Sequence, residues 1–189
     1  MLTSYRVSCE AARRAVLAAA VFAGMALPAA ADILASYETG GRDLFSVRVP
    51  DNWVVSAGGF EARQAPEGIG AVPRVLGLRP EEDPRIWVGF VSPDGVATIA
   101  EAEAYIQSLD LRLVEDPQVG APERVVIGGR SARTYTGTGT REGRPVNFTI
   151  ALIDMPGART VIGVIVGENG ARGLYRDEIT ALVRSFRPM

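Results

Sequence analysis

The sequence lacks histidine and lysine altogether, and its single cysteine, Cys9, lies within the first ten residues. Nucleophilic triads, Schiff-base lysines and zinc, haem or iron–sulfur centres depend chiefly on these three residue types. Beyond Cys9 there is also no thiol to form a disulfide. The composition therefore predicts a protein that is not an enzyme, that holds no metal or cofactor, and that is stabilised by its core.

The first 31 residues carry the three parts of a secretory signal. Arg6, Arg13 and Arg14 form a basic start, an Ala-rich apolar run follows, and Ala29-Ala30-Ala31 resembles a cleavage site. The run is shorter than the roughly 20 residues that a bilayer requires. We expect cleavage after Ala31 and a periplasmic or secreted protein without a membrane span. The paired arginines fit the twin-arginine route and the general (Sec) route equally, so the route stays open.

The remaining residues, 32–189, have the length of a single domain. They contain 17 arginines and 21 acidic residues, which gives a net charge of −4. Nucleic acids and anionic membrane surfaces attract basic proteins, so neither is an expected partner. No second apolar run in this part is long enough to cross a membrane.

Apolar patterning predicts most of this domain to be strands. Residues 45–49 alternate apolar and polar side chains, whereas 86–91 and 161–166 are apolar throughout, as in strands covered on both faces. Gly128-Gly129 and residues 141–144 have the composition of hairpin turns. Further strands are expected from Trp53, near Phe60, and at 73–78, 124–127, 130–138 and 146–152.

Two helices are expected. Thr98 and Glu101 form a capping box before a helix at 98–109. An apolar stripe with helical spacing predicts a final helix, stopped by Pro188; its members are Leu174, Tyr175, Ile179, Leu182, Val183 and Phe186. The predicted fold is α+β: an antiparallel sheet of about six strands with helices on both faces.

Several short segments resemble the PsbP-like superfamily. They are Phe45 to Trp53 (F-x-V-x-x-P-x-x-W), the capped helix, the hairpin Ile127 to Ala132 (I-G-G-R-x-A) and the final helix. The resemblance spans roughly residues 33–187 and implies an antiparallel sheet in an α/β/α sandwich. It also implies a protein that binds other proteins. No functional residue is carried over, because the histidines and lysines of the photosynthetic member have no counterpart here.

Three residues are weak candidates for partner contact. Trp53 is a possible binding aromatic, although its apolar neighbours favour core packing. Arg141 and Arg144 flank a hairpin tip, where they would either meet an acidic partner or remain in solvent. The acidic run 81–83 has oxygen ligands for calcium but lacks the EF-hand pattern, which favours a solvated loop.

The leading hypothesis is an exported, non-catalytic module that binds another exported or membrane-associated protein. A carrier of a small ligand or lipid in an apolar cavity is the alternative. A hydrolase that uses only carboxylates comes third, because such chemistry needs two acids about 5–10 Å apart in a cleft.

Overall fold

The computed structural model describes residues 32–58, 75–108 and 114–189. The expected signal (1–31), the expected strand near Phe60 and the last residue of the helix expected at 98–109 lie outside them. The described residues form eleven strands and three helices: β1 (Ile33–Thr39), β2 (Arg42–Val49), β3 (Trp53–Gly58), β4 (Val75–Pro80), β5 (Ile86–Val91), α1 (Ile99–Ser108), β6 (Glu115–Val119), β7 (Glu123–Ile127), β8 (Arg130–Arg141), β9 (Arg144–Met155), β10 (Arg159–Glu168), α2 (Ala171–Leu174), α3 (Arg176–Ser185) and β11 (Arg187–Pro188).

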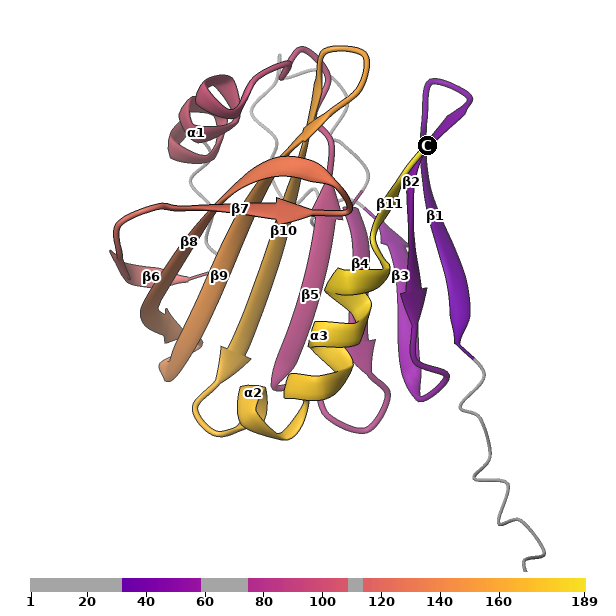
Figure 1. Cartoon of the computed structure of the whole chain (residues 1–189). Coiled ribbons are helices and arrows are strands. Elements are labelled where there is room, and N and C mark those ends of the chain that lie inside the picture. Colours follow the sequence, from indigo (N-terminus) through magenta and orange to yellow (C-terminus); the bar gives the residue numbers. More distant parts are fainter. Residues whose placement is uncertain (1–31, 59–74, 109–113) are drawn as a thin grey trace, which may run out of the picture.

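The strands form two antiparallel sheets (Figure 1). The main sheet has eight strands in the order β3-β4-β5-β10-β9-β8-β6, with β7 also paired to β8, and the small sheet has the order β1-β2-β11. The expectation of about six strands in one sheet was too low, and β1, β6 and β11 were not predicted as strands. Every residue of β6 is exposed, and its pairing with β8 is interrupted around Pro117, which has no amide hydrogen to donate.

The two faces of the main sheet are covered differently. Ile153 of β9 packs in the cluster that includes Ile179 and Leu182 of α3, whereas its neighbour Leu152 packs with Ala102 of α1. We call these the α3 face and the α1 face. Strands of the small sheet share the cover of the α3 face, and each long helix has only ten residues. The expectation of helices over both faces is therefore met only in part.

The capping box predicted at the start of α1 is confirmed. The Thr98 hydroxyl accepts a hydrogen bond from the Glu101 amide at 3.2 Å, and the Glu101 carboxylate accepts one from the Thr98 amide at 3.0 Å and one from the Ala97 amide at 2.7 Å. These bonds lower the pKa of Glu101, with the Ala97 amide as the largest cause. The helix starts at Ile99 because its first free amides are satisfied there.

Both predicted hairpin turns are confirmed. Gly128 and Gly129 have φ of 58° and 78°, and Glu142 and Gly143 have 52° and 74°, as two-residue type I′ turns require. At Gly128 the space is restricted as well. A Cβ there would lie 2.7 Å from the carbonyl oxygen of Phe186, so the turn packs directly on the end of α3.

The final helix begins later than expected. Leu174, predicted to belong to its buried stripe, is 72% exposed in the separate one-turn helix α2. Tyr175 has φ −104° and ψ 17°, which interrupts the helix before α3 starts at Arg176. From there Ile179 and Leu182 are buried as predicted. Within the described residues, no helix is long and apolar enough to cross a bilayer.

Candidate functional site

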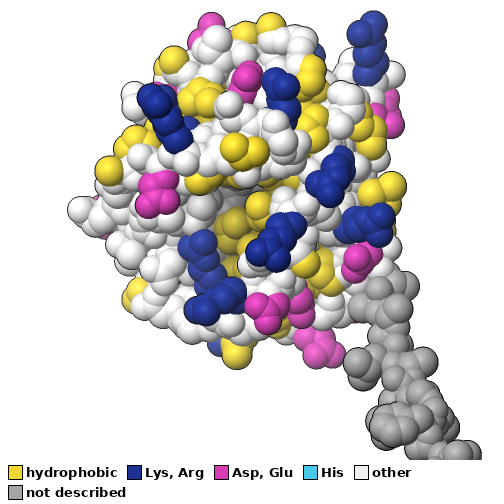
Figure 2. Space-filling model, in the orientation of Figure 1, with side chains coloured by type: hydrophobic (Ala, Val, Ile, Leu, Met, Phe, Trp, Pro, Cys, Tyr) yellow, Lys and Arg dark blue, Asp and Glu magenta, His cyan; other side chains and the backbone are white. Residues whose placement is uncertain are grey.

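An open apolar groove lies on the α3 face of the main sheet. It is lined by residues of β9 and β10 together with residues of β7 and α3. Its lining includes Ile127 of β7, Ala151 of β9, Ile165 of β10 and Val183 of α3. The cavity at its centre has a volume of about 30 Å³, far below the roughly 300–1,000 Å³ of typical small-ligand pockets. Figure 2 shows an apolar hollow on this face with basic side chains around its rim.

Arg172 of α2 lies at the edge of this hollow. Its Nη2 donates a hydrogen bond to the hydroxyl oxygen of Thr149, which also lines the groove, at 2.7 Å. Gly167 of β10 makes room for it, because a Cβ on that glycine would lie 3.4 Å from the Cβ of Arg172 and 2.6 Å from Cδ1 of Ile86. The stem of Arg172 is thus held close to the sheet, and its guanidinium reaches from α2 to β9.

The charge of Arg172 is not balanced by a carboxylate among the described residues. The ion pairs among these residues involve other arginines. Within the same residues, the side chain of Arg172 donates its hydrogen bond to Thr149. Burial lowers the pKa of Arg172, as expected when a cation is withdrawn from water without a counter-charge. At neutral pH the side chain nevertheless remains a cation.

Helix α3 adds further positive charge to the groove. Arg176 and Thr180 lie seven and three residues before Val183, so the three share one side of the helix. Arg184 lies four residues after Thr180 and eight after Arg176, so it continues this row along the helix. Both arginines are exposed. In the part of the chain that the structure describes, neither forms an ion pair. We call the apolar hollow together with Arg172, Arg176 and Arg184 the basic groove.

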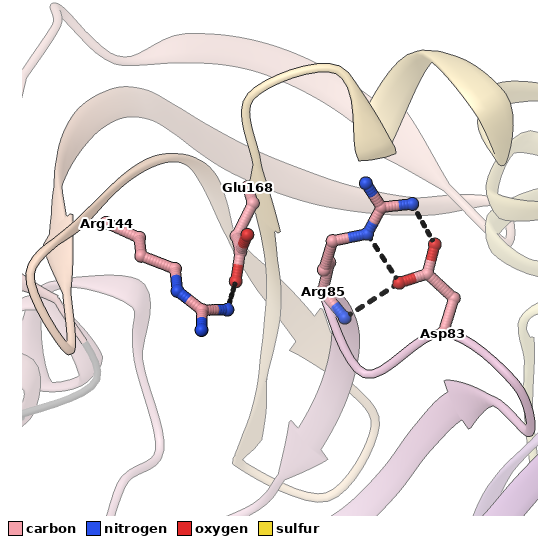
Figure 3. A network of polar contacts seen from close by, with 4 residues as sticks. All are labelled: Asp83, Arg85, Arg144 and Glu168. Carbon is pink, nitrogen blue, oxygen red and sulfur yellow. Dashed lines mark hydrogen bonds and ion pairs between the residues drawn. The ribbon is translucent and has the colours of Figure 1, made fainter.

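The two arginines predicted at the β8–β9 hairpin tip lie at one end of the main sheet. Arg141 and Arg144 face each other in the strand register. Figure 3 shows Arg144 reaching Glu168 of β10, with Nη1 and Oε1 2.9 Å apart. The hairpin tip therefore carries a partly neutralised charge, and it stands apart from the residues that line the groove. Its two interpretations, partner contact and a solvated turn, both stay predictions.

Of the acidic run 81–83 that was considered for calcium, Asp83 is engaged by Arg85. Asp83 is only 7% exposed, and its carboxylate accepts hydrogen bonds from Nε, Nη2 and the amide of Arg85 at 2.8, 2.7 and 3.0 Å (Figure 3). The Arg85 side chain is the main cause that lowers the pKa of Asp83 to about 2. In the described ranges no three metal-binding side chains come together.

This pairing gives a pH-dependent prediction. Folding lowers the pKa of Asp83 from 3.8 to about 2. The stabilisation of the folded state by the ionised Asp83 is therefore present above about pH 4 and is lost as the pH drops towards 2. We expect Asp83→Asn to lower the free energy of unfolding by about 1 kcal/mol at pH 7, after discounting for solvent screening. Urea unfolding at pH 7 and pH 2 measures this, with exposed Glu82→Gln as the control. An equal loss at both pH values would show that the ion pair is not the cause.

Trp53 is part of the core, as the alternative interpretation of this residue predicted. It is 3% exposed, and its indole Nε1 donates a hydrogen bond to Oε2 of Glu178 at 2.7 Å. Its ring meets Tyr175 edge-on, with centroids 6.1 Å apart. Trp53 therefore fixes the start of α3 against β3, and it does not line the groove.

The residues that build the basic groove were not predicted as a site. Arg172 was assigned no role, and Thr149 was only one member of a predicted strand. Arg172 and Thr149 come together for two reasons. The strand register places Thr149 of β9 beside Ile165 of β10, and α2, which follows β10, packs Arg172 against Gly167. The sequence signal is Gly167 near the end of β10, since a glycine in a strand indicates a close approach without identifying the residue that approaches.

Several solved structures resemble this chain, among them cyanobacterial PsbP, LpqN and Mog1p. The solution structure of cyanobacterial PsbP from Synechocystis is 8% identical, with 89% of this chain and 99% of that one covered and a TM-score of 0.55. LpqN, involved in cell envelope biogenesis of Mycobacterium tuberculosis, is 13% identical (83% and 90% covered, TM-score 0.46). The Saccharomyces cerevisiae Ran-binding protein Mog1p is 12% identical (84% and 96% covered, TM-score 0.45).

The comparison with cyanobacterial PsbP establishes the fold. At 8% identity over 89% of the chain it concerns architecture alone. This chain has a PsbP-like fold, as the resemblance in the sequence implied. No family model and no curated protein matches the chain.

Proposed function

We propose that this chain is an exported, non-catalytic accessory module that binds a protein partner through the basic groove. Export rests on the signal-like first 31 residues, and the absence of catalysis rests on the missing histidine, lysine and second cysteine. The observation that carries the proposal is the groove itself. It combines a shallow apolar hollow with arginines that have no carboxylate partner among the described residues.

These features fit a protein surface better than a small-molecule site. Arginine is enriched at protein interfaces, where its planar group pairs with carboxylates in two parallel hydrogen bonds. The groove is basic although residues 32–189 carry a net charge of −4. Its charge is therefore local, and it complements an acidic patch on a partner.

The alternative functions receive less support from this site. A carrier would need an apolar cavity large enough to enclose its cargo, and the hollow holds only about 30 Å³. A carboxylate-only hydrolase would need acidic side chains in the cleft, and the described lining of the groove includes none. Both remain outcomes of the experiment below.

Native mass spectrometry of residues 32–189, isolated from the native periplasm, tests the proposal. We expect a reproducible adduct with the mass of one protein partner. The double variant Arg141→Glu/Arg144→Glu serves as the comparison, because it alters the hairpin tip and leaves the groove intact. We expect it to retain the adduct with less than a twofold change in abundance.

Each other outcome has a clear meaning. Loss of the adduct in the hairpin variant would move the binding site to the tip and contradict the assignment to the groove. A bound small mass in place of a protein would favour a carrier. A protein that remains bare at micromolar concentration would overturn the proposed function.

A further inference from the structure

The environment of Arg172 specifies what the proposed partner presents. Arg172 is half-buried, its stem packs over Gly167, and one of its guanidinium nitrogens is fixed by Thr149. Among the described residues no carboxylate lies within ion-pair distance of it. Leaving a cation partly desolvated and unpaired is unfavourable, and a carboxylate that arrives from outside removes this penalty.

The hollow next to Arg172 limits the size of the attached group. Its lining includes Ala151, Ile165 and the buried Gly163, so the contact surface is apolar. The hollow is shallow and open, and its central volume is only about 30 Å³. It therefore offers a contact surface for a small branched side chain, whereas a fatty acid would need an enclosing pocket several times larger. The two features together match a carboxylate that lies directly beside a small apolar side chain.

We propose that Arg172 is the specificity-determining residue of the groove and that it binds a peptide carboxylate adjacent to a small branched apolar side chain. This inference rests on the proposed function, because it names the feature of the protein partner that the groove recognises. Thr149 acts as a positioning residue, since its hydroxyl accepts the hydrogen bond that orients the guanidinium. The carboxylate is the C-terminal carboxylate of the partner, because in a C-terminal residue the carboxylate and the side chain are attached to the same Cα and lie directly side by side.

The test is a titration of isotope-labelled residues 32–189 followed by NMR. The probes are N-acetyl-L-valinate, its uncharged amide, and octanoate. We expect N-acetyl-L-valinate to shift the resonances of Thr149, Gly163 and the side chain of Arg172, with at least about tenfold weaker binding of the amide. Octanoate is expected to bind more weakly than the valinate because the hollow cannot hold its chain.

Three variants separate the role of Arg172 from general electrostatics and from folding. Arg172→Gln is expected to abolish the difference between the valinate and the amide. Thr149→Val keeps the charge and is expected to weaken valinate binding about three- to tenfold, which remains measurable if Arg172→Gln does not fold. Arg42→Gln, an exposed site in the small sheet, removes the same charge and is expected to change nothing.

The proposal is overturned if the amide binds as well as the valinate, if octanoate binds more tightly than the valinate, or if both groove variants bind like the wild type. The titration needs no natural partner. A positive titration with a bare protein in the native mass spectrum would therefore refute the proposed function alone. A protein adduct with a negative titration would refute only the role of Arg172.

Discussion

The variant Phe45→Ala is expected to lose about 3–5 kcal/mol of its free energy of unfolding. Phe45 is completely buried. Its ring stacks on Tyr37 and Phe186 with centroids 5.1 and 4.9 Å apart, and it is tilted against Phe90 at 5.6 Å. Because Phe45 belongs to the small sheet and Phe90 to the main sheet, one ring joins both sheets and the end of α3.

Urea unfolding followed by circular dichroism measures this loss. The matched control is Val126→Ala, since Val126 of β7 is 74% exposed; we expect a change within about 0.5 kcal/mol. If Phe45→Ala lost less than about 1 kcal/mol, the two sheets would not depend on this aromatic cluster. The position of Phe186, which packs on Phe45 and lines the groove, would then not depend on this cluster.

The second large effect concerns binding. The double variant Arg176→Glu/Arg184→Glu is expected to weaken the affinity for the protein partner by about ten- to a hundredfold, mainly through slower association. Both side chains are exposed on α3, the helix whose Val183 lines the groove, so the change reverses charge without disturbing the buried side of α3. Surface plasmon resonance at two salt concentrations measures the affinity, and the wild type should show the stronger salt dependence.

The control for this variant is Arg42→Glu/Arg48→Glu, which changes the net charge by the same amount. Both residues are exposed on β2 of the small sheet. We expect less than a threefold change in affinity. An equal loss in the two double variants would mean that overall charge, and not the groove, attracts the partner.

Elements with a strong local pattern were predictable from the sequence. The alternation in β2, the apolar runs 86–91 in β5 and 161–166 in β10, and the capping box of α1 all have their cause within a few neighbouring residues. β6 was missed because its residues are exposed and show no alternation of apolar and polar side chains. It forms a strand because its backbone pairs with the edge of β8. Such a strand depends on tertiary context, which local patterns do not contain.

The same contrast holds for the candidate site. Trp53 was correctly weighed as a core residue, since its apolar neighbours indicated burial. Arg172 was not recognised, because its significance depends on a hydrogen bond to Thr149, 23 positions away in the sequence. It depends also on the missing side chain of Gly167. Neither relation has a signature in the residues that flank Arg172.

The most direct measurement of the central claim is site-specific photo-crosslinking in the native periplasm. The chain has no lysine, so a photoreactive phenylalanine must be inserted genetically. We would place it at Thr180 on the groove wall and, as a control, at Glu38 on β1 of the small sheet; both positions are exposed. The account predicts one crosslinked protein partner from Thr180 and none from Glu38. The same partner crosslinked equally from both positions, or from Glu38 alone, would contradict binding through the basic groove.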